Sequence, residues 1–445
     1  MPHRRSSAVL RAAGRACLIW VAACSIPRTP FTPAEGPVDA DVATPDAPPA
    51  GGGLRVAITG AGVGTVAVTH AGAPCDAACQ AGLANGEVAQ LTAAAAAGSW
   101  FRGWTTACSG RHGCAVTVRA GLVVTAEFTP QPNRVFVSST LHDGNFGGLG
   151  AGDAICQGLA TAAGLAGQYR LLLVPPMQLP ASRALGGRGW IRTDDEPVWD
   201  AATSIGLGAG WFPITFDERG LEVPISAVWG PFTTGTNCGG WATTAGSDGP
   251  WYFSLVAGRL ATPVAGAAQV CGAQQRFLCL GVDRVVPVAP APTTGRLAFA
   301  TAGLWNPTQG IAAADTLCAA EAANAGKAGV FLALLADVGA AATVRFDLTG
   351  APWVRVDGLP LVASAKALET TNVLRVAPGM RLDGTASPVL TLPLGAPAPG
   401  VAGLATTTCA GYTSATASIQ SYDSVGVVAN YASSCGPMPV ICLQR

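Results

Sequence analysis

One segment of the chain returns later in it, and this duplication constrains the fold more than any other feature. Residues 134–156 align without a gap with residues 296–318. Each copy opens with a short apolar strand, continues through a turn-rich loop and enters an amphipathic helix that carries Asp and then Cys. Because an internal repeat decides the architecture, we expect two related modules in tandem. Four cysteines recur in the same order in the two copies: Cys156, Cys238, Cys271 and Cys279, then Cys318, Cys409, Cys435 and Cys442.

The 14 cysteines of the chain sort by position. Two lie before residue 25, four lie in residues 53–130 and four lie in each repeated copy. Even numbers favour disulfides, which persist only in an oxidising compartment. A zinc site is the alternative, and Cys75-x3-Cys79 and Cys108-x5-Cys114 come nearest to the ligand spacing. Since these intervals hold few other ligands, we favour disulfides and expect neither a metal nor a cofactor.

The N-terminus predicts export. Residues 1–23 have an Arg-rich start and an apolar run too short to span a bilayer, which is the layout of a signal peptide. Val21-Ala-Ala-Cys24 resembles the bacterial lipobox, which implies that Cys24 becomes the lipid-modified first residue; an ordinary signal peptide with an incidental Cys24 is the alternative. Ser25 resembles the residue of lipoproteins sorted to the outer membrane, so we expect a lipid-anchored protein at the outer membrane or cell surface. Residues 24–53, rich in Pro, Ala, Asp and Gly, offer little to bury and predict a disordered tether.

The charge balance argues against a nucleic-acid partner. Lys plus Arg and Asp plus Glu number 26 each, and four of the arginines precede Cys24. Without that segment the balance is 22 − 26 = −4. A mildly acidic surface has no electrostatic reason to bind a polyphosphate.

Residues 54–129 predict a small β module. Several alternating segments read as half-buried strands separated by Gly-rich turns. Phe101-x-Gly103-Trp104 and Cys108-Ser-Gly…Cys114 resemble the bacterial repeat domain related to internalin B-repeats. The resemblance implies a spacer or stalk, with each cysteine pair, Cys75–Cys79 and Cys108–Cys114, closing its own loop. Staples of this kind suit a domain with a marginal core.

Each repeated copy resembles the C-type-lectin-like fold, and more closely a bacterial domain of unknown function allied to the endostatin branch. The matching segments of the first copy are Val135-Phe-Val-Ser-Ser-Thr, Gly147-Gly-Leu-x-Ala-Gly-Asp-Ala-Ile-Cys156, Ala163-Gly-Leu-x-Gly-x-Tyr169, Trp229…Gly235-Thr-x-Cys238 and Cys271…Phe277-Leu-Cys279. The first module would span residues 131–284 and the divergent second one residues 294–445. The expected fold is therefore an α+β, β-rich multidomain chain. The resemblance implies these disulfides: Cys156–Cys279, Cys238–Cys271, Cys318–Cys442 and Cys409–Cys435.

The calcium chemistry of lectins does not come with this resemblance. Neither copy holds a Glu-Pro-Asn or Gln-Pro-Asp loop or a Trp-Asn-Asp strand, which supply the oxygen ligands of calcium. For the acidic clusters at residues 194–196 and 217–218 we expect solvated loops. The wide irregular stretch of the first module instead offers aromatic side chains that could anchor a ligand. The candidates are Trp211, Trp229, Trp241 and Trp251; for Trp229 and Trp241, packing beside a disulfide is the favoured alternative.

Catalysis is not predicted. Among the repeated modules only the first has a histidine, His142, and no nucleophile, zinc-protease or phosphate-loop motif is present. For Asp153 and Asp315, near a helix start, we expect a capping or dipole role. The sequence thus predicts a surface adhesion protein that recognises an extracellular protein or glycan through the loops of the first module. The alternatives are a structural envelope or stalk protein without a specific ligand and, less favoured, an extracellular hydrolase.

Overall fold

The fold is described from a computed structural model of the chain. The described residues are 53–69, 74–77, 79–174, 178–205, 210–223, 227–229, 237–245, 252–254, 270–371, 374–387, 391–423 and 428–445. The expected leader, tether and lipid site at Cys24 therefore lie outside them, apart from residue 53. Within these residues, no helix has the length and hydropathy needed to cross a bilayer.

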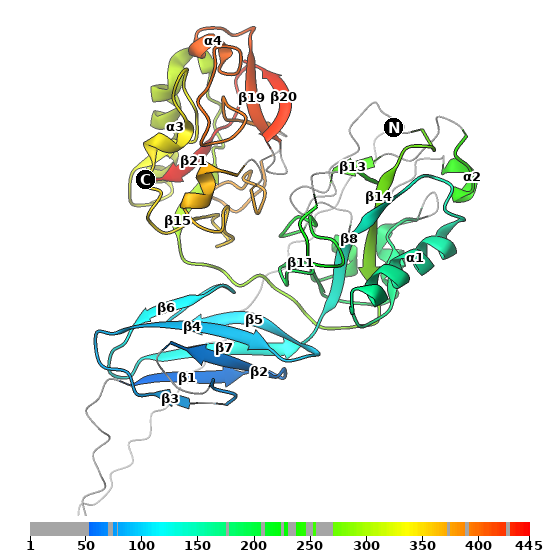
Figure 1. Ribbon diagram of the computed structural model, residues 1–445. Helices are drawn as coiled ribbons and strands as arrows, with labels where there is room; N and C mark the ends of the chain where they lie inside the picture. Colours follow the sequence, from blue (N-terminus) through cyan, green and yellow to red (C-terminus); the bar gives the residue numbers. More distant parts are fainter. Residues whose placement is uncertain are drawn as a thin grey trace, which may run out of the picture. The chain divides into compact units, whose positions relative to one another are not determined.

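The β module is a sandwich of two small sheets (Figure 1). One sheet has the strand order β3-β1-β7-β5, with β1 parallel to β7, and the other has the order β2-β4-β6. Alternate side chains of the strands are buried and meet in one core, where Phe101 packs on Trp104 and Phe128 with ring centres 5.0 and 5.3 Å apart. The strands are β1 (Leu54–Thr59), β2 (Gly64–Val68), β3 (Cys79–Ala81), β4 (Val88–Ala95), β5 (Ser99–Thr106), β6 (Cys114–Thr117) and β7 (Val123–Pro130).

The first repeated module is built on one mixed sheet with the path β11-β10-β8-β14-β12-β13, and β9 also pairs with β14. Helix α1 packs against β9 and buries Cys156 and Ala160. The elements are β8 (Asn133–His142), α1 (Leu149–Ala162), β9 (Tyr169–Leu171), β10 (Trp190–Ile191), β11 (Pro197–Trp199), β12 (Ala227–Trp229), α2 (Cys238–Trp241), β13 (Tyr252–Ser254) and β14 (Gln275–Gly281), with short 3-10 helices at Pro180–Ala184 and Ala202–Ser204.

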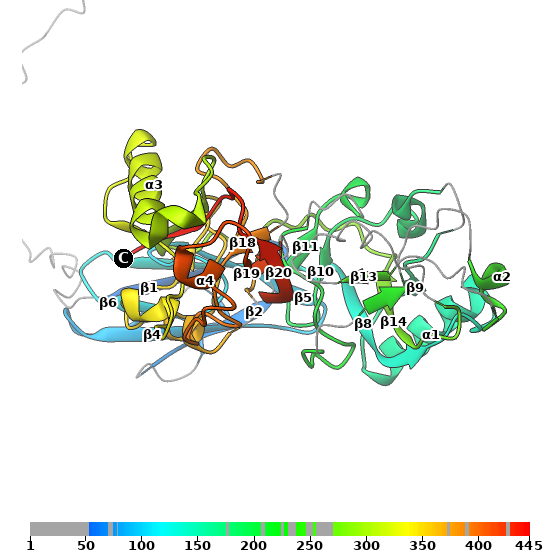
Figure 2. The same ribbon diagram turned by 90° about the horizontal axis from the view of Figure 1, so that it is seen from above.

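The second repeated module has a sheet of order β16-β21-β15-β17 and a separate sheet β18-β19-β20. Figures 1 and 2 both show α3 on one side of this module and the β18–β20 sheet on the other. The elements are β15 (Arg296–Ala300), α3 (Gly310–Asn324), β16 (Phe331–Ala333), β17 (Trp353–Val354), β18 (Thr391–Pro393), α4 (Cys409–Tyr412), β19 (Ser418–Asp423), β20 (Val428–Ser434) and β21 (Ile441–Gln444), with 3-10 helices at Pro307–Gln309, Ala342–Arg345 and Lys366–Glu369.

The duplication read from the sequence is present in the strand pairing. In the first module β8 pairs in parallel with β10 and antiparallel with β14, and β14 also pairs with β9. In the second, β15 pairs in the same senses with β17 and β21, and β21 with β16. Even the buried indoles agree: Trp190 donates to the carbonyl of Gly281 and Trp353 to that of Gln444, each at 2.7 Å. The chain is thus β-rich, with several small sheets and few helices.

Asp153 and Asp315 do not cap a helix, contrary to the expectation from the sequence. Helix α1 begins at Leu149 and has no acidic residue in its first turn. Asp153 instead accepts a hydrogen bond from the Leu171 amide at 2.9 Å and forms an ion pair with Arg183, which itself donates to the Leu171 carbonyl at 3.0 Å. This arrangement ties the helix to β9. The second module repeats it with Asp315, Ala333 and Arg345.

Candidate functional site

The disulfides fix the irregular parts of both modules to their sheets. Four of them join the cysteines that the lectin-like resemblance pairs: Cys156–Cys279, Cys238–Cys271, Cys318–Cys442 and Cys409–Cys435. In the β module, Cys108 is bonded to Cys114 and Cys75 is also disulfide-bonded. The side chain of Cys79, its expected partner, lies outside the described residues.

A left-handed turn carries one half-cystine of the inner bridge in each module. In α4 the φ angles of Cys409, Ala410, Gly411 and Tyr412 are 55°, 54°, 67° and 62°, and the four residues of α2 have values of 50° to 78°. The turn closes with helix-like bonds of opposite hand, such as the Tyr412 amide to the Thr408 carbonyl at 2.7 Å. Consecutive residues in this region are unfavourable unless they are glycine. Both copies have this unfavourable backbone conformation at the equivalent position, so the turn is a shared structural feature of the two modules.

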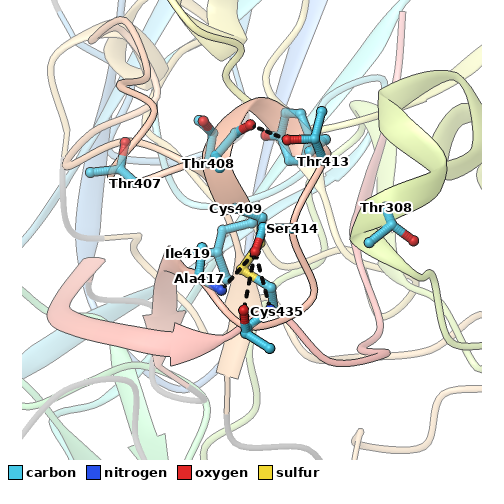
Figure 3. Close-up of a disulfide and its surroundings, with 12 residues drawn as sticks. Thr308, Thr407, Thr408, Cys409, Thr413, Ser414, Ala417, Ile419 and Cys435 are labelled. Carbon is cyan, nitrogen blue, oxygen red and sulfur yellow. Dashed lines mark hydrogen bonds between the residues drawn. A yellow bond between two sulfur atoms is a disulfide. The ribbon is translucent and has the colours of Figure 1, made fainter.

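Figure 3 shows how the turn of the second module is held. The Thr413 hydroxyl donates to the Ala410 carbonyl at 2.7 Å, and the Ser414 amide donates to the Cys409 carbonyl at 3.0 Å. The Cys435 amide donates to the Ala417 carbonyl at 3.2 Å. Hydrogen bonds on both sides of the disulfide therefore keep the turn in place.

Replacing Ala410 by Gly is expected to stabilise the protein by about 1 kcal/mol, because glycine adopts the left-handed region without a Cβ penalty. Ala410 is exposed, so little packing is lost. The measurement is the urea midpoint of the full chain. Ala405→Gly serves as the control, since Ala405 is also exposed but lies outside the left-handed region. A midpoint that falls equally in both variants would contradict the strain argument.

The aromatic candidates of the first module lie mostly under its loops. Trp229 and Trp241 are 0% and 1% exposed, and their ring centres lie 5.8 Å apart. Phe146 stacks on Trp241 at 5.2 Å, and the Trp229 indole donates to the His142 carbonyl at 2.8 Å. These two tryptophans therefore cannot present their rings to a ligand, because they fill the core beside the Cys238–Cys271 disulfide. Their position agrees with the alternative stated for them in the sequence analysis, which is packing beside a disulfide.

The other candidates differ from these two. Trp211 is half-buried and packs against buried side chains that include Phe212. Trp251 lies outside the described residues. His142 stacks on Phe277 with ring centres 4.2 Å apart, and burial lowers its pKa, which the nearby Asp143 only partly offsets.

The acidic clusters are not solvated loops, and this corrects the expectation for Glu196, Asp217 and Glu218. Their exposed fractions are 4%, 1% and 4%. Asp217 forms an ion pair with Arg219 at 2.6 Å, and Glu218 accepts from the Ser139 amide at 3.0 Å and from the Ser139 hydroxyl. These carboxylates are buried because they satisfy backbone amides and guanidinium groups. Within the described residues, no group of three His, Cys, Asp or Glu is placed to hold a metal ion.

Glu196 lies against two arginines and a histidine. Its carboxylate is 2.7 Å from the Arg375 guanidinium, 3.2 Å from the His112 imidazole and 3.8 Å from Arg111. Burial alone would raise the pKa of Glu196. The hydrogen bond with His112 and the charges of the arginines, Arg192 included, outweigh burial and lower the pKa from 4.5 to about 2.

Acid is therefore expected to remove the stability that Glu196 contributes. The folded pKa lies below the ordinary one, so the contribution is complete above pH 4.5 and is lost as the pH falls towards 2. The difference corresponds to about 3 kcal/mol. The difference between the wild type and Glu196→Gln in urea unfolding should be clear near about pH 6 and should shrink steadily as the pH falls from about 4.5 towards 2. A difference that does not change with pH would contradict this assignment.

Comparison with known proteins finds a family match for one part of the chain. Residues 54–132 match the model of the family described as Divergent InlB B-repeat domain. A comparison with curated proteins finds none that matches the chain. The β sandwich stapled by Cys108–Cys114 is thus the part that carries a family match, and the resemblance of this module to internalin-type B-repeats is confirmed.

Proposed function

We propose that this chain is a lipid-anchored, exported surface protein that recognises an extracellular protein or glycan through the loop face of its first repeated module. The observation that carries the proposal is the construction of that face. The described residues between β11 and β14 include the Cys238–Cys271 disulfide and the left-handed turn, and they contribute to a closed aromatic core. Loops on a rigid base are the usual place for recognition. Recognition here would proceed without calcium.

A C-type-lectin-like fold for both repeated modules is part of the proposal. In each, one disulfide joins the helix to the last strand, and a second joins two cysteines that both lie between these elements in the sequence. The shared order of strand, helix and returning strand supports the same assignment. The fold alone does not name a ligand.

The binding test uses the mature full chain on an array of glycans and extracellular proteins. Leu221 is 57% exposed and lies in the irregular stretch of the first module; Leu404, 61% exposed in the second module, is a matched control. We expect Leu221→Asp to abolish binding and Leu404→Asp to retain it. Loss in both variants or in neither would contradict the assignment to the first module.

The anchor is tested separately. Cys24→Ser is expected to move the protein from the membrane fraction to the soluble fraction, whereas Cys17→Ser, within the expected leader, should leave it anchored. Mass spectrometry that finds an unmodified mature N-terminus would overturn the lipid anchor without touching the binding proposal.

A structural stalk without a specific ligand is the second candidate function. The B-repeat match at residues 54–132 favours it, because the resemblance implies a spacer. An array on which the full chain binds nothing would support this candidate against the first.

A further inference from the structure

The first repeated module contacts both other modules, and this has consequences for how the whole chain moves. Domains in one chain move relative to one another by default, unless the interface between them is large and apolar. Residues 51–445 make one compact unit. Three sets of contacts between the modules, one apolar, one ionic and one along the connecting segment, point to an exception from that default.

The apolar contact involves two residues of the first module. Phe212 is 2% exposed and belongs to the same buried cluster as Leu374 and Val376 of the second module. Trp211, beside it, packs against that cluster and also against a second cluster, which joins Trp100 of the β module to Ile191 and Val288. The first module thus places neighbouring aromatic rings against both other modules.

The ionic contact centres on Glu196. The side chains that pair directly with its carboxylate come from outside its own module: Arg111 and His112 from the β module and Arg375 from the second module. Next to it, the Asp195 carbonyl accepts from the Trp100 indole at 3.0 Å and from the Arg111 guanidinium. A buried carboxylate that loses its partners destabilises the folded protein strongly. Because the partners of Glu196 come from the other two modules, this cluster opposes their separation from the first module.

The segment that connects the two repeated modules is packed as well. A Cβ at Gly103 would lie 2.7 Å from the Ala291 side chain, and one at Gly110 would lie 2.5 Å from that of Thr293. From the second module, a Cβ at Gly358 would lie 2.6 Å from Pro292. The Gly358 carbonyl also accepts from the Thr293 amide at 2.8 Å. Glycines of two modules thus make room for the connecting segment from both sides.

We propose that the β module and the two repeated modules form a single rigid body, with Glu196 as the central link and the segment around residues 291–294 held between the β module and the second repeated module. The B-repeat part then fixes the orientation of the two repeated modules. This inference concerns motion and does not depend on any ligand.

The test is a distance distribution between two probes in the full chain, introduced through unnatural amino acids at exposed Val88 in the β module and Val344 in the second module. We expect a single narrow distribution in the wild type. Gly110→Ala and Gly358→Ala should broaden it, because the new Cβ displaces the connecting segment. Glu196→Gln should broaden it too, because the carboxylate that links the modules loses its charge.

Two matched variants separate this effect from backbone strain. Gly98 has the same φ as Gly110, 77°, and Gly384 at 81° is close to Gly358 at 79°, but a Cβ at either control meets nothing within 4 Å. Gly98→Ala and Gly384→Ala should therefore leave the distribution narrow. A broad distribution in the wild type, or equal distributions in the paired variants, would overturn the proposal.

Discussion

Replacing both Cys156 and Cys279 by alanine is expected to lower the free energy of unfolding by about 5 kcal/mol, the largest single effect anticipated for this protein. The bridge joins α1 to β14 across a sequence separation of 123 residues. In the chain-entropy model, the longer the loop that a disulfide closes, the more freedom it removes from the unfolded chain. Both half-cystines are completely buried, so the change also loosens the core. The measurement is the urea midpoint of the oxidised full chain.

The control is the same double change at Cys108 and Cys114. Their disulfide spans a separation of 6 residues, so the model gives a loss of about 2 kcal/mol. The second module provides a replicate, because Cys318–Cys442 has a separation of 124 and should behave like the first outer bridge. Similar losses for the short and the long loop would contradict the entropic account.

Replacing Trp241 by alanine is expected to cost about 3–5 kcal/mol, as for other large aromatic side chains removed from a core. Trp241 is 1% exposed and contacts Phe146 and Trp229 through stacked and edge-on rings. Any loss of binding in this variant should follow the loss of folded protein. Thermal unfolding followed by near-UV circular dichroism measures the change.

Leu221→Ala is the control for this prediction, because Leu221 is exposed and its change should alter stability by less than about 0.5 kcal/mol. If Trp241→Ala abolished binding while its melting temperature stayed at the wild-type value, the ring would be acting at the surface. That outcome would reverse the assignment of Trp241 to the core.

The sequence predicted those parts of the fold that are encoded locally or by repetition. Alternation of apolar residues gave strands such as β1 and β2, and the duplication gave the equivalence of α1 with α3 and of β8 with β15. The pattern predicted that Asp153 matters but assigned it the wrong role. Its partner Arg183 lies 30 residues further along, and a contact at that separation leaves no periodic signal.

Burial of polar and aromatic side chains could not be predicted in the same way. Glu196 looks like part of an exposed acidic run, since the arginines that neutralise it lie far away at Arg111 and Arg375. Trp229 ends the short strand β12 and Trp211 lies outside any strand or helix; the first is completely buried and the second half-buried. The composition draws attention to such aromatic residues, but it does not show whether their rings are buried or exposed.

The inner bridges have a consequence for redesign. The Cα atoms of Cys238 and Cys271 are 5.5 Å apart, and those of Cys409 and Cys435 are 5.7 Å apart, although the enclosed segments differ in length. Each segment starts from the same left-handed turn and ends at a buried half-cystine. The two segments therefore have equivalent end points. We expect that a foreign loop with these end points can replace either segment while the rest of the module keeps its structure.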